Sequence, residues 1–213
     1  MVIASHAVFA TYGFWPPNDP RGSWSDQVWA QHLQRFGDAK KVSTRRSIAH
    51  VPFDRNLRNQ IDDALLYPKV RLIQQQRECI SAGIADIVKS LRIKVYAIAI
   101  LQDHIHFISA RHIEDVETLV GHLKRAASRA LSKANSHPLN RYQNDDGSFP
   151  TPWVRGGWKR FLNSPEEIAG AIEYVRNNPR RAKLPDQRYP FETPFVWHRG
   201  TPNNTNQTNR RNV

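Results

Sequence analysis

Two apolar runs that follow each other almost without a break constrain this fold more than any other feature of the sequence. Residues 94–102 read KVYAIAILQ and residues 104–110 read HIHFISA, and both runs are rich in residues that favour strands. Gln102 and Asp103 join them, which leaves room for a tight turn and for no crossover connection. The sequence therefore predicts an antiparallel hairpin near the middle of a sheet.

Strand and helix patterns on both sides of this hairpin define the order of the remaining elements. The sequence predicts a strand at 5–12, a helix at about 68–91, a second helix at about 115–134, a strand region at 153–162 and a third helix at 164–178. The order β–α–β–β–α–β followed by a helix is that of an α+β ferredoxin-like sandwich. We expect an antiparallel sheet with helices on one face and an additional C-terminal helix.

We expect a single domain over residues 1–200. The segment near 20–65 is mixed, charged and weakly periodic, and it is predicted to be a loop-rich insertion with room for one short helix. The tail at 201–213 is rich in asparagine and has no periodicity, so it is predicted to be disordered.

The charge of the chain favours a polyanionic partner. Lysine and arginine number 31 against 19 aspartate and glutamate residues, and the isoelectric point is near 10.3. No apolar run is long enough to span a bilayer and the N-terminal residues lack a secretory pattern, so we expect no membrane partner. The single cysteine, Cys79, excludes an internal disulfide framework and suits a reducing cytoplasm.

A basic stripe on the second predicted helix is the candidate surface for the backbone of a nucleic acid. Arg125, Arg129 and Lys133 fall at i, i+4 and i+8, so they share one side of the helix. Lys124 lies next to them and joins the candidate contacts. An ordinary solvated helix face is the alternative interpretation.

The histidines of the hairpin are the first candidate site residues. Side chains two apart on a strand point to the same face, so His104 and His106 lie together while Ile105 points away. Two imidazoles on a rigid central strand suit a divalent cation. Two hydrogen-bonded core histidines are the alternative.

The helix at 164–178 supplies further candidates. Ser164 and Glu167 form the pattern of a capping box, which fixes the phase of the helix. Tyr174 and Asn178 are four residues apart and lie along one edge, and Pro179 is expected to end the helix near Asn178. A tyrosine hydroxyl beside a metal-binding amide suits phosphoryl transfer, while a half-buried packing tyrosine is the alternative.

Together these motifs resemble a known family. The sequence DHIHF at 103–107 followed by YVRNNPRRA at 174–182 resembles the single-tyrosine HUH transposases, and in particular the REP-associated tyrosine transposases. The segments TYGFWPPNDPRGSW at 11–24 and WVRGGWKRFL at 153–162 resemble the same branch. The resemblance covers roughly residues 5–184 in the predicted order of elements.

The resemblance implies a metal-dependent enzyme that nicks single-stranded DNA and transfers the strand. His104, His106 and Asn178 would hold Mg²⁺ or Mn²⁺ against the scissile phosphate. Tyr174 would be the nucleophile, and its attack would leave a 5′-phosphotyrosine and a free 3′-hydroxyl. The implied partner is single-stranded DNA with hairpin or palindromic repeats, and the implied protein is bacterial, cytoplasmic, bound to the nucleoid through DNA, and a monomer or homodimer.

One departure and two alternatives accompany this reading. Arg180 and Arg181 stand where the family is often more apolar, and we predict that they contact DNA. The first alternative is a non-catalytic hairpin-binding protein domesticated from a transposase. The second is a zinc hydrolase that combines the histidine pair with another histidine such as His112 or His122.

Overall fold

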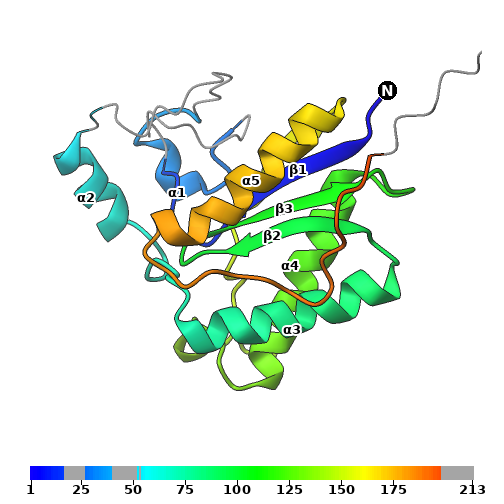
Figure 1. Cartoon of the computed structure of the whole chain (residues 1–213). Coiled ribbons are helices and arrows are strands. Elements are labelled where there is room, and N and C mark those ends of the chain that lie inside the picture. Colours follow the sequence, from blue (N-terminus) through cyan, green and yellow to red (C-terminus); the bar gives the residue numbers. More distant parts are fainter. Residues whose placement is uncertain (17–26, 40–51, 53, 198–213) are drawn as a thin grey trace, which may run out of the picture.

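Four strands form one antiparallel sheet in the computed structural model, which describes residues 1–16, 27–39, 52 and 54–197 (Figure 1). Their order across the sheet is β2–β3–β1–β4, and every neighbouring pair is antiparallel. This arrangement is that of the ferredoxin-like sandwich, so the predicted fold class is confirmed. The strands are β1 (Ala4–Ala10), β2 (Val95–Ile100), β3 (His104–Ala110) and β4 (Trp158–Leu162).

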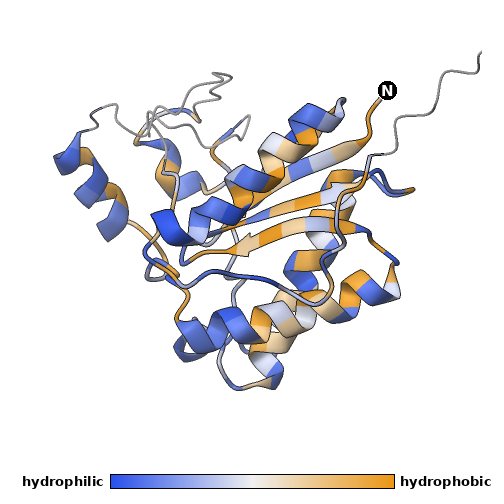
Figure 2. Ribbon diagram, viewed as in Figure 1, coloured by the Kyte–Doolittle hydropathy of each residue, from blue (hydrophilic) through white to orange (hydrophobic). Residues whose placement is uncertain are grey.

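Helices cover both faces of this sheet. α3 and α4 pack against each other on one face, and α5 crosses the opposite face (Figure 1). Alternating strand residues divide between two cores, so that Phe107 packs toward α3 and α4 while Ile108 packs toward α5. Hydrophobic residues concentrate on the strands, and α2 is mostly hydrophilic (Figure 2). The helices are α1 (Gln31–Gln34), α2 (Arg55–Asp63), α3 (Gln74–Ser90), α4 (Val116–Lys133) and α5 (Pro165–Arg181).

The helix predicted at 68–91 begins only at Gln74, so the prediction is wrong for its first residues. Residues 68–73 are not helical. The backbone N–H of Val70 donates to Tyr12 and that of Leu72 donates to Gln102, at 2.9 and 2.7 Å. The side chains of Val70 and Leu72 are both buried. The apolar spacing of this segment therefore reflects an extended chain bonded next to the ends of β1 and β2, and not a helix.

α5 continues past Pro179 to Arg181, so its predicted end at Asn178 is wrong by three residues. Pro179 falls in the last turn of α5, so the backbone bond that its missing N–H removes lies close to the end of the helix. The backbone N–H groups of Lys183 and Leu184 bond back to the last turn, and Lys183 adopts a left-handed conformation with φ of 56°. This is the geometry of a Schellman motif, and it turns the chain away from the helix axis.

After α5, residues 185–195 form a C-terminal strap along the outer edge of β2 (Figure 1). The side-chain amide of Gln187 accepts a hydrogen bond from the N–H of Ile100 at 2.8 Å and donates one to its carbonyl at 2.9 Å. The backbone N–H of Thr193 donates to the carbonyl of Val95 at 2.6 Å. The strap therefore occupies hydrogen-bonding positions that a further strand would use.

Parts of the predicted insertion, and the tail predicted to be disordered at 201–213, lie outside the described residues. The described parts of the segment 20–65 contain two helices, α1 and α2, where one was expected. Asp54 caps α2, but Ile61 is its only buried residue, which explains why apolar periodicity did not reveal it. None of the helices in the described ranges is long and apolar enough to cross a membrane.

Candidate functional site

The predicted nucleophile and the predicted metal pair meet on the face of the sheet that α5 covers. Ile105 and Phe107 of β3 point into the core beneath α3 and α4, so the alternate residues His104 and His106 point toward α5. The ring of Tyr174 meets that of His106 edge-on, with the ring centres 5.6 Å apart. Residues 68 positions apart are thereby brought together by the packing of one helix on the sheet.

The two histidines have a spacing that fits one divalent ion. Their Nε2 atoms are 3.1 Å apart and the rings are inclined by 73°. Two ligands at right angles around an octahedral ion, each about 2.1 Å from it, lie about 3.0 Å apart. In the described part of the chain no three His, Cys, Asp or Glu side chains form a metal site. A third ligand would therefore be a different kind of group, such as an amide, water or phosphate oxygen.

Each histidine makes a second contact through its other ring nitrogen. Nδ1 of His104 lies 2.7 Å from a carboxylate oxygen of Asp103, and Nδ1 of His106 lies 3.0 Å from Nε2 of His6. His6 is on β1, and sequence reasoning missed it. The only available signal was that it lies within a predicted strand, because the pairing of β1 with β3 was needed to place it beside His106.

Burial keeps the inner histidines uncharged. It is the largest cause that lowers the pKa of His106 well below its ordinary value, followed by the charges of His104 and His6. Burial, and then the charge of Arg160, lowers the pKa of His6 to about 4. Burial works to raise the pKa of Asp103, but the hydrogen bond with His104 and nearby charges bring it below its ordinary value. Neutral imidazoles beside a carboxylate are the protonation states that metal binding needs.

Asn178 and Tyr174 occupy successive turns of α5. The Asn178 side chain is buried, and its Nδ2 donates to the backbone carbonyl of Tyr174 at 3.1 Å. This bond uses the amide nitrogen as a donor, so Oδ1 is the atom able to ligate a cation. Tyr174 itself is 44% exposed, and the guanidinium carbon of Arg181 lies 5.5 Å from the centre of its ring. The predicted nucleophile is thus exposed to solvent and has a cation beside it.

The candidate DNA contacts divide between two faces of the molecule. Arg125, Arg129 and Lys133 are exposed on α4, which lies across the sheet from α5. Arg180 and Arg181 are exposed at the C-terminal end of α5, where Arg181 lies against the Tyr174 ring and Arg180 lies 3.9 Å from Asp186. The structure therefore brings Arg181 to the site and leaves the basic stripe on the opposite layer.

Lys124 has internal partners. Its Nζ donates to the carbonyls of Val154 and Gly156, at 2.8 and 2.5 Å, and lies 5.6 Å from the centre of the Phe9 ring. Burial lowers its pKa to about 8. These contacts tie α4 to the loop before β4. Whether Lys124 also contacts DNA stays a prediction.

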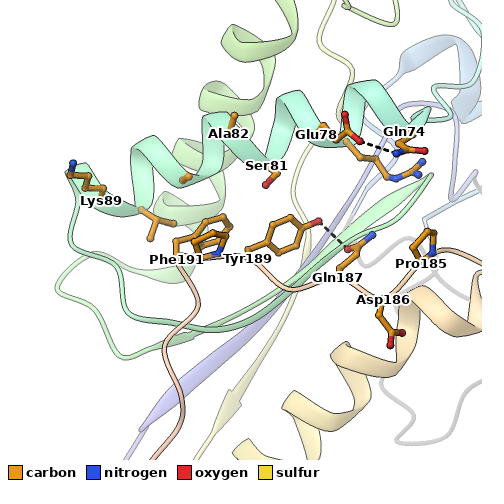
Figure 3. Close-up of a pocket in the computed structure, with 14 residues that line it drawn as sticks. Gln74, Glu78, Ser81, Ala82, Lys89, Pro185, Asp186, Gln187, Tyr189 and Phe191 are labelled. Atoms are coloured by element: carbon orange, nitrogen blue, oxygen red, sulfur yellow. Dashed lines mark hydrogen bonds between the residues drawn. The ribbon is translucent and has the colours of Figure 1, made fainter.

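A separate groove of about 670 Å³ lies between α3 and the C-terminal strap (Figure 3). Tyr189 and Phe191 of the strap lie opposite Ser81 on α3, and Val88 adds to a mostly apolar lining. None of the predicted site residues lines this groove. The chemistry suggested by the sequence belongs to the α5 face and not to this cavity.

Sequence comparison relates part of the chain to a known family. Residues 66–150 match the model of the family described as "Transposase IS200 like". This segment is therefore similar to IS200-like transposases. It contains α3, the β2–β3 hairpin with His104 and His106, and α4, whereas Tyr174 and Asn178 lie beyond it. The resemblance to transposases is confirmed.

Two transposases are among the solved structures that are similar to this chain. A REP-associated tyrosine transposase bound to a REP hairpin has 10% identity and a TM-score of 0.44, covering 84% of this chain and 67% of that one. A putative transposase from Deinococcus radiodurans R1 has 12% identity and a TM-score of 0.40, covering 83% and 91%. No curated protein matches the sequence. Both TM-scores are below 0.5, so the similarity to transposases rests on the sequence match over residues 66–150.

Proposed function

We propose that this protein nicks single-stranded DNA and transfers the strand through a covalent bond to Tyr174. The observation that carries the proposal is the approach of the Tyr174 ring to His106, 5.6 Å between centres, where the Nε2 atoms of His104 and His106 converge to 3.1 Å. The position of both histidines inside the IS200-like segment supports a transposase reaction.

The proposed chemistry is a transesterification. The phenol oxygen of Tyr174 attacks the scissile phosphorus, the new O–P bond forms as the bond to the 3′-oxygen breaks, and that oxygen takes up a proton while the phenol loses one. Rejoining by another 3′-hydroxyl reverses the step and needs no ATP, because one phosphate ester replaces another. A Mg²⁺ or Mn²⁺ ion bound at this site would polarise the phosphate oxygens.

The side chains of the site have distinct tasks in this proposal. His104 and His106 offer two nitrogen ligands, and Asn178 offers an amide oxygen one helical turn after the nucleophile. Arg181, beside the Tyr174 ring, places a guanidinium where a phosphate bound to the tyrosine would lie. Arg180 would contact the neighbouring DNA backbone.

The proposed substrate is single-stranded DNA that carries a hairpin or palindromic repeat. Its single-stranded, hairpin form follows from the resemblance of the motifs to the REP-associated branch, and the net charge of +12 favours a polyanion. We expect a cytoplasmic protein that acts as a monomer or homodimer and joins the nucleoid through its DNA.

Formation of a covalent adduct tests the proposal. Because the tyrosine would keep the 5′-phosphate, a hairpin oligonucleotide labelled at its 3′ end should yield an SDS-resistant labelled protein with Mg²⁺ or Mn²⁺. A label at the 5′ end should instead appear on a shorter DNA strand that has a free 3′-hydroxyl and is not bound to protein. Tyr174→Phe should remove both products, since only the attacking oxygen is lost.

Tyr142→Phe is the matched control, because Tyr142 is also an exposed tyrosine and lies in the short helix Asn140–Tyr142, outside the site. This variant should form the adduct like the wild type. An adduct that persists in Tyr174→Phe would refute the assigned nucleophile. Tight binding of hairpins from repeats flanking the gene, with no adduct, would support the non-catalytic binder.

The zinc hydrolase has little support in the described residues. Both ring nitrogens of His112 are engaged, Nε2 with the carbonyl of Leu91 at 3.0 Å and Nδ1 with the N–H of Glu114 at 3.1 Å. His122 contacts Glu114 and Arg125, at 3.3 and 2.9 Å. Neither histidine joins the pair on β3.

A further inference from the structure

We propose that His6 is a positioning residue that holds His106 with its Nε2 free to bind the ion. The inference rests on the proposed metal site and extends it to a strand outside the IS200-like segment. Its basis is the hydrogen bond of 3.0 Å between Nε2 of His6 and Nδ1 of His106.

The proton in this bond decides which nitrogen of His106 is available. With an ion bound, Nε2 of His104 and Nε2 of His106, which lie 3.1 Å apart, must both carry lone pairs, so His106 must hold its proton on Nδ1 and donate it to Nε2 of His6. Without an ion, the same 3.1 Å contact is a hydrogen bond, and because His104 donates through Nδ1 to Asp103, His106 donates through Nε2 and accepts from His6. The proposal requires the first arrangement in the metal-bound protein, with His6 as the acceptor.

The partner histidine shows the same pattern with a group that can only accept. The ionised carboxylate of Asp103 lies 2.7 Å from Nδ1 of His104, so Nδ1 of His104 is the donor and its Nε2 is free. An acceptor on the far nitrogen of a metal-binding histidine fixes the ring and its tautomer. His6 contacts Nδ1 of His106 in the same way that Asp103 contacts Nδ1 of His104.

Packing holds His6 in this position. Its side chain is 5% exposed, and Trp158 of β4 contacts it edge-on, with ring centres 5.0 Å apart. The Tyr174 ring lies on α5 with its centre 6.3 Å from that of His6. His6 is not placed to be a third ligand, because it faces Nδ1 of His106 and the ion would lie at Nε2.

Mn²⁺ binding by the full chain without DNA tests the inference independently of catalysis. Free Mn²⁺ is followed by electron paramagnetic resonance during a titration. His6→Ala and His6→Phe should raise the Kd about 10- to 100-fold, the usual effect of removing an outer partner of a ligand. His6→Gln should retain most of the affinity, since the glutamine oxygen reaches a position similar to Nε2 and can accept the same bond.

His137→Gln is the matched control for the loss of a buried histidine. His137 is 4% exposed, stacks on Phe149 and accepts a bond from the N–H of Leu139, so its replacement should leave Mn²⁺ affinity unchanged. The tautomer of His106 is a second measurement, and a purely structural role of His6 would not determine it. Long-range ¹H–¹⁵N spectra of the wild type saturated with Mg²⁺, a diamagnetic ion, should show His106 protonated on Nδ1.

The outcomes separate the two proposals. Wild-type protein that takes up no Mn²⁺, or His104→Ala protein that binds it as well as wild type, overturns the metal site and this inference with it. Binding that depends on His104 and His106 but is unchanged in His6→Ala and His6→Phe overturns the role of His6 alone. Protonation of His106 on Nε2 in the wild type saturated with Mg²⁺ also overturns it, even if His6→Ala does not fold.

Discussion

Lys124 shows how one lysine differs from its neighbours on α4. Arg125 and Arg129 are exposed on the same helix, but the ammonium of Lys124 is turned toward two carbonyls of the loop before β4. Sequence spacing places it beside the basic stripe and does not show that its side chain reaches this loop. Burial lowers its pKa to about 8, and this shift has a measurable consequence.

We predict that Lys124 makes stability depend on pH in the alkaline range. Its ordinary pKa is 10.5, so between about pH 8 and 10.5 the unfolded chain holds more of this proton than the folded one. Stability therefore rises with pH through this window, and below it the cost of burying the charge is present in full. Relative to Lys124→Met, the wild type should gain up to about 3 kcal/mol of unfolding free energy.

Denaturant unfolding of both proteins at about pH 7, 9 and 10.5 measures this difference. Lys133→Met is the control, because Lys133 is exposed on the same helix and should give a difference that is flat over most of the window. Parallel stability curves for the wild type and Lys124→Met would contradict the prediction.

His6 marks the limit of prediction for single residues. Alternation along a strand tells which side chains share a face, and it placed His104 and His106 together correctly. It does not tell which residue of a distant strand lies beside them. The pairing of Val8 with His106, which brings His6 next to the site, is fixed by packing between segments about 100 residues apart.

At the scale of elements, the contact between α3 and α4 depends on a glycine. A Cβ added to Gly83 would lie 2.7 Å from the carbonyl oxygen of Ala126 and 2.7 Å from Cβ of Ala130. Neither neighbour is a flexible side-chain end, so relief would require the helices to separate. The close approach of the two helices beneath the sheet is therefore tied to the absence of a side chain at this position.

We predict that Gly83→Ala lowers the free energy of unfolding by about 1–3 kcal/mol, the usual cost of overpacking a core. Gly170→Ala is the matched control, since Gly170 is exposed on α5 and its added Cβ meets nothing within 4 Å. That variant should be neutral or more stable by up to about 1 kcal/mol, because alanine favours helices. Equal effects of the two substitutions, measured by denaturant unfolding, would refute the packing argument.

Long elements with regular apolar spacing were predictable from the sequence, and the errors fall where tertiary bonds override local pattern. The hairpin and α4 lie within a residue or two of their predicted bounds. Residues 68–73 have apolar residues at helical spacing, yet they bond to Tyr12 and Gln102 instead. Pro179 predicted that the last helix ends at Asn178, but the helix continues to Arg181 and ends in the Schellman turn at Lys183.

At the scale of the whole molecule, the sheet separates two layers with different tasks. α3 and α4 cover one face with the larger core, and α5 brings Tyr174 to the other. The basic stripe on α4 and the proposed site on α5 therefore face different directions (Figure 1). The C-terminal strap connects these layers, because it leaves the end of α5, crosses the edge of β2 and packs against α3.

We predict that Gln187→Ala loosens this edge specifically. The variant removes both side-chain bonds to Ile100, so amide hydrogen exchange at Ile100 should accelerate while that at Phe107 on the central strand β3 changes far less. Global stability should fall by about 1–3 kcal/mol. Asp186→Ala is the control, because Asp186 is an exposed neighbour that bonds to no strand, and unchanged exchange at Ile100 in Gln187→Ala would contradict the prediction.

The strap also bears on how this chain avoids aggregation. An exposed strand edge can recruit another chain through its free amides, and at β2 the amides of Ile98 and Ile100 already have partners in Glu192 and Gln187. The opposite edge, β4, has only five residues and carries Lys159 and Arg160, charged side chains of the kind that disfavour pairing with another strand edge. Hydrogen bonds protect one edge of the sheet, and a short strand with charged side chains protects the other.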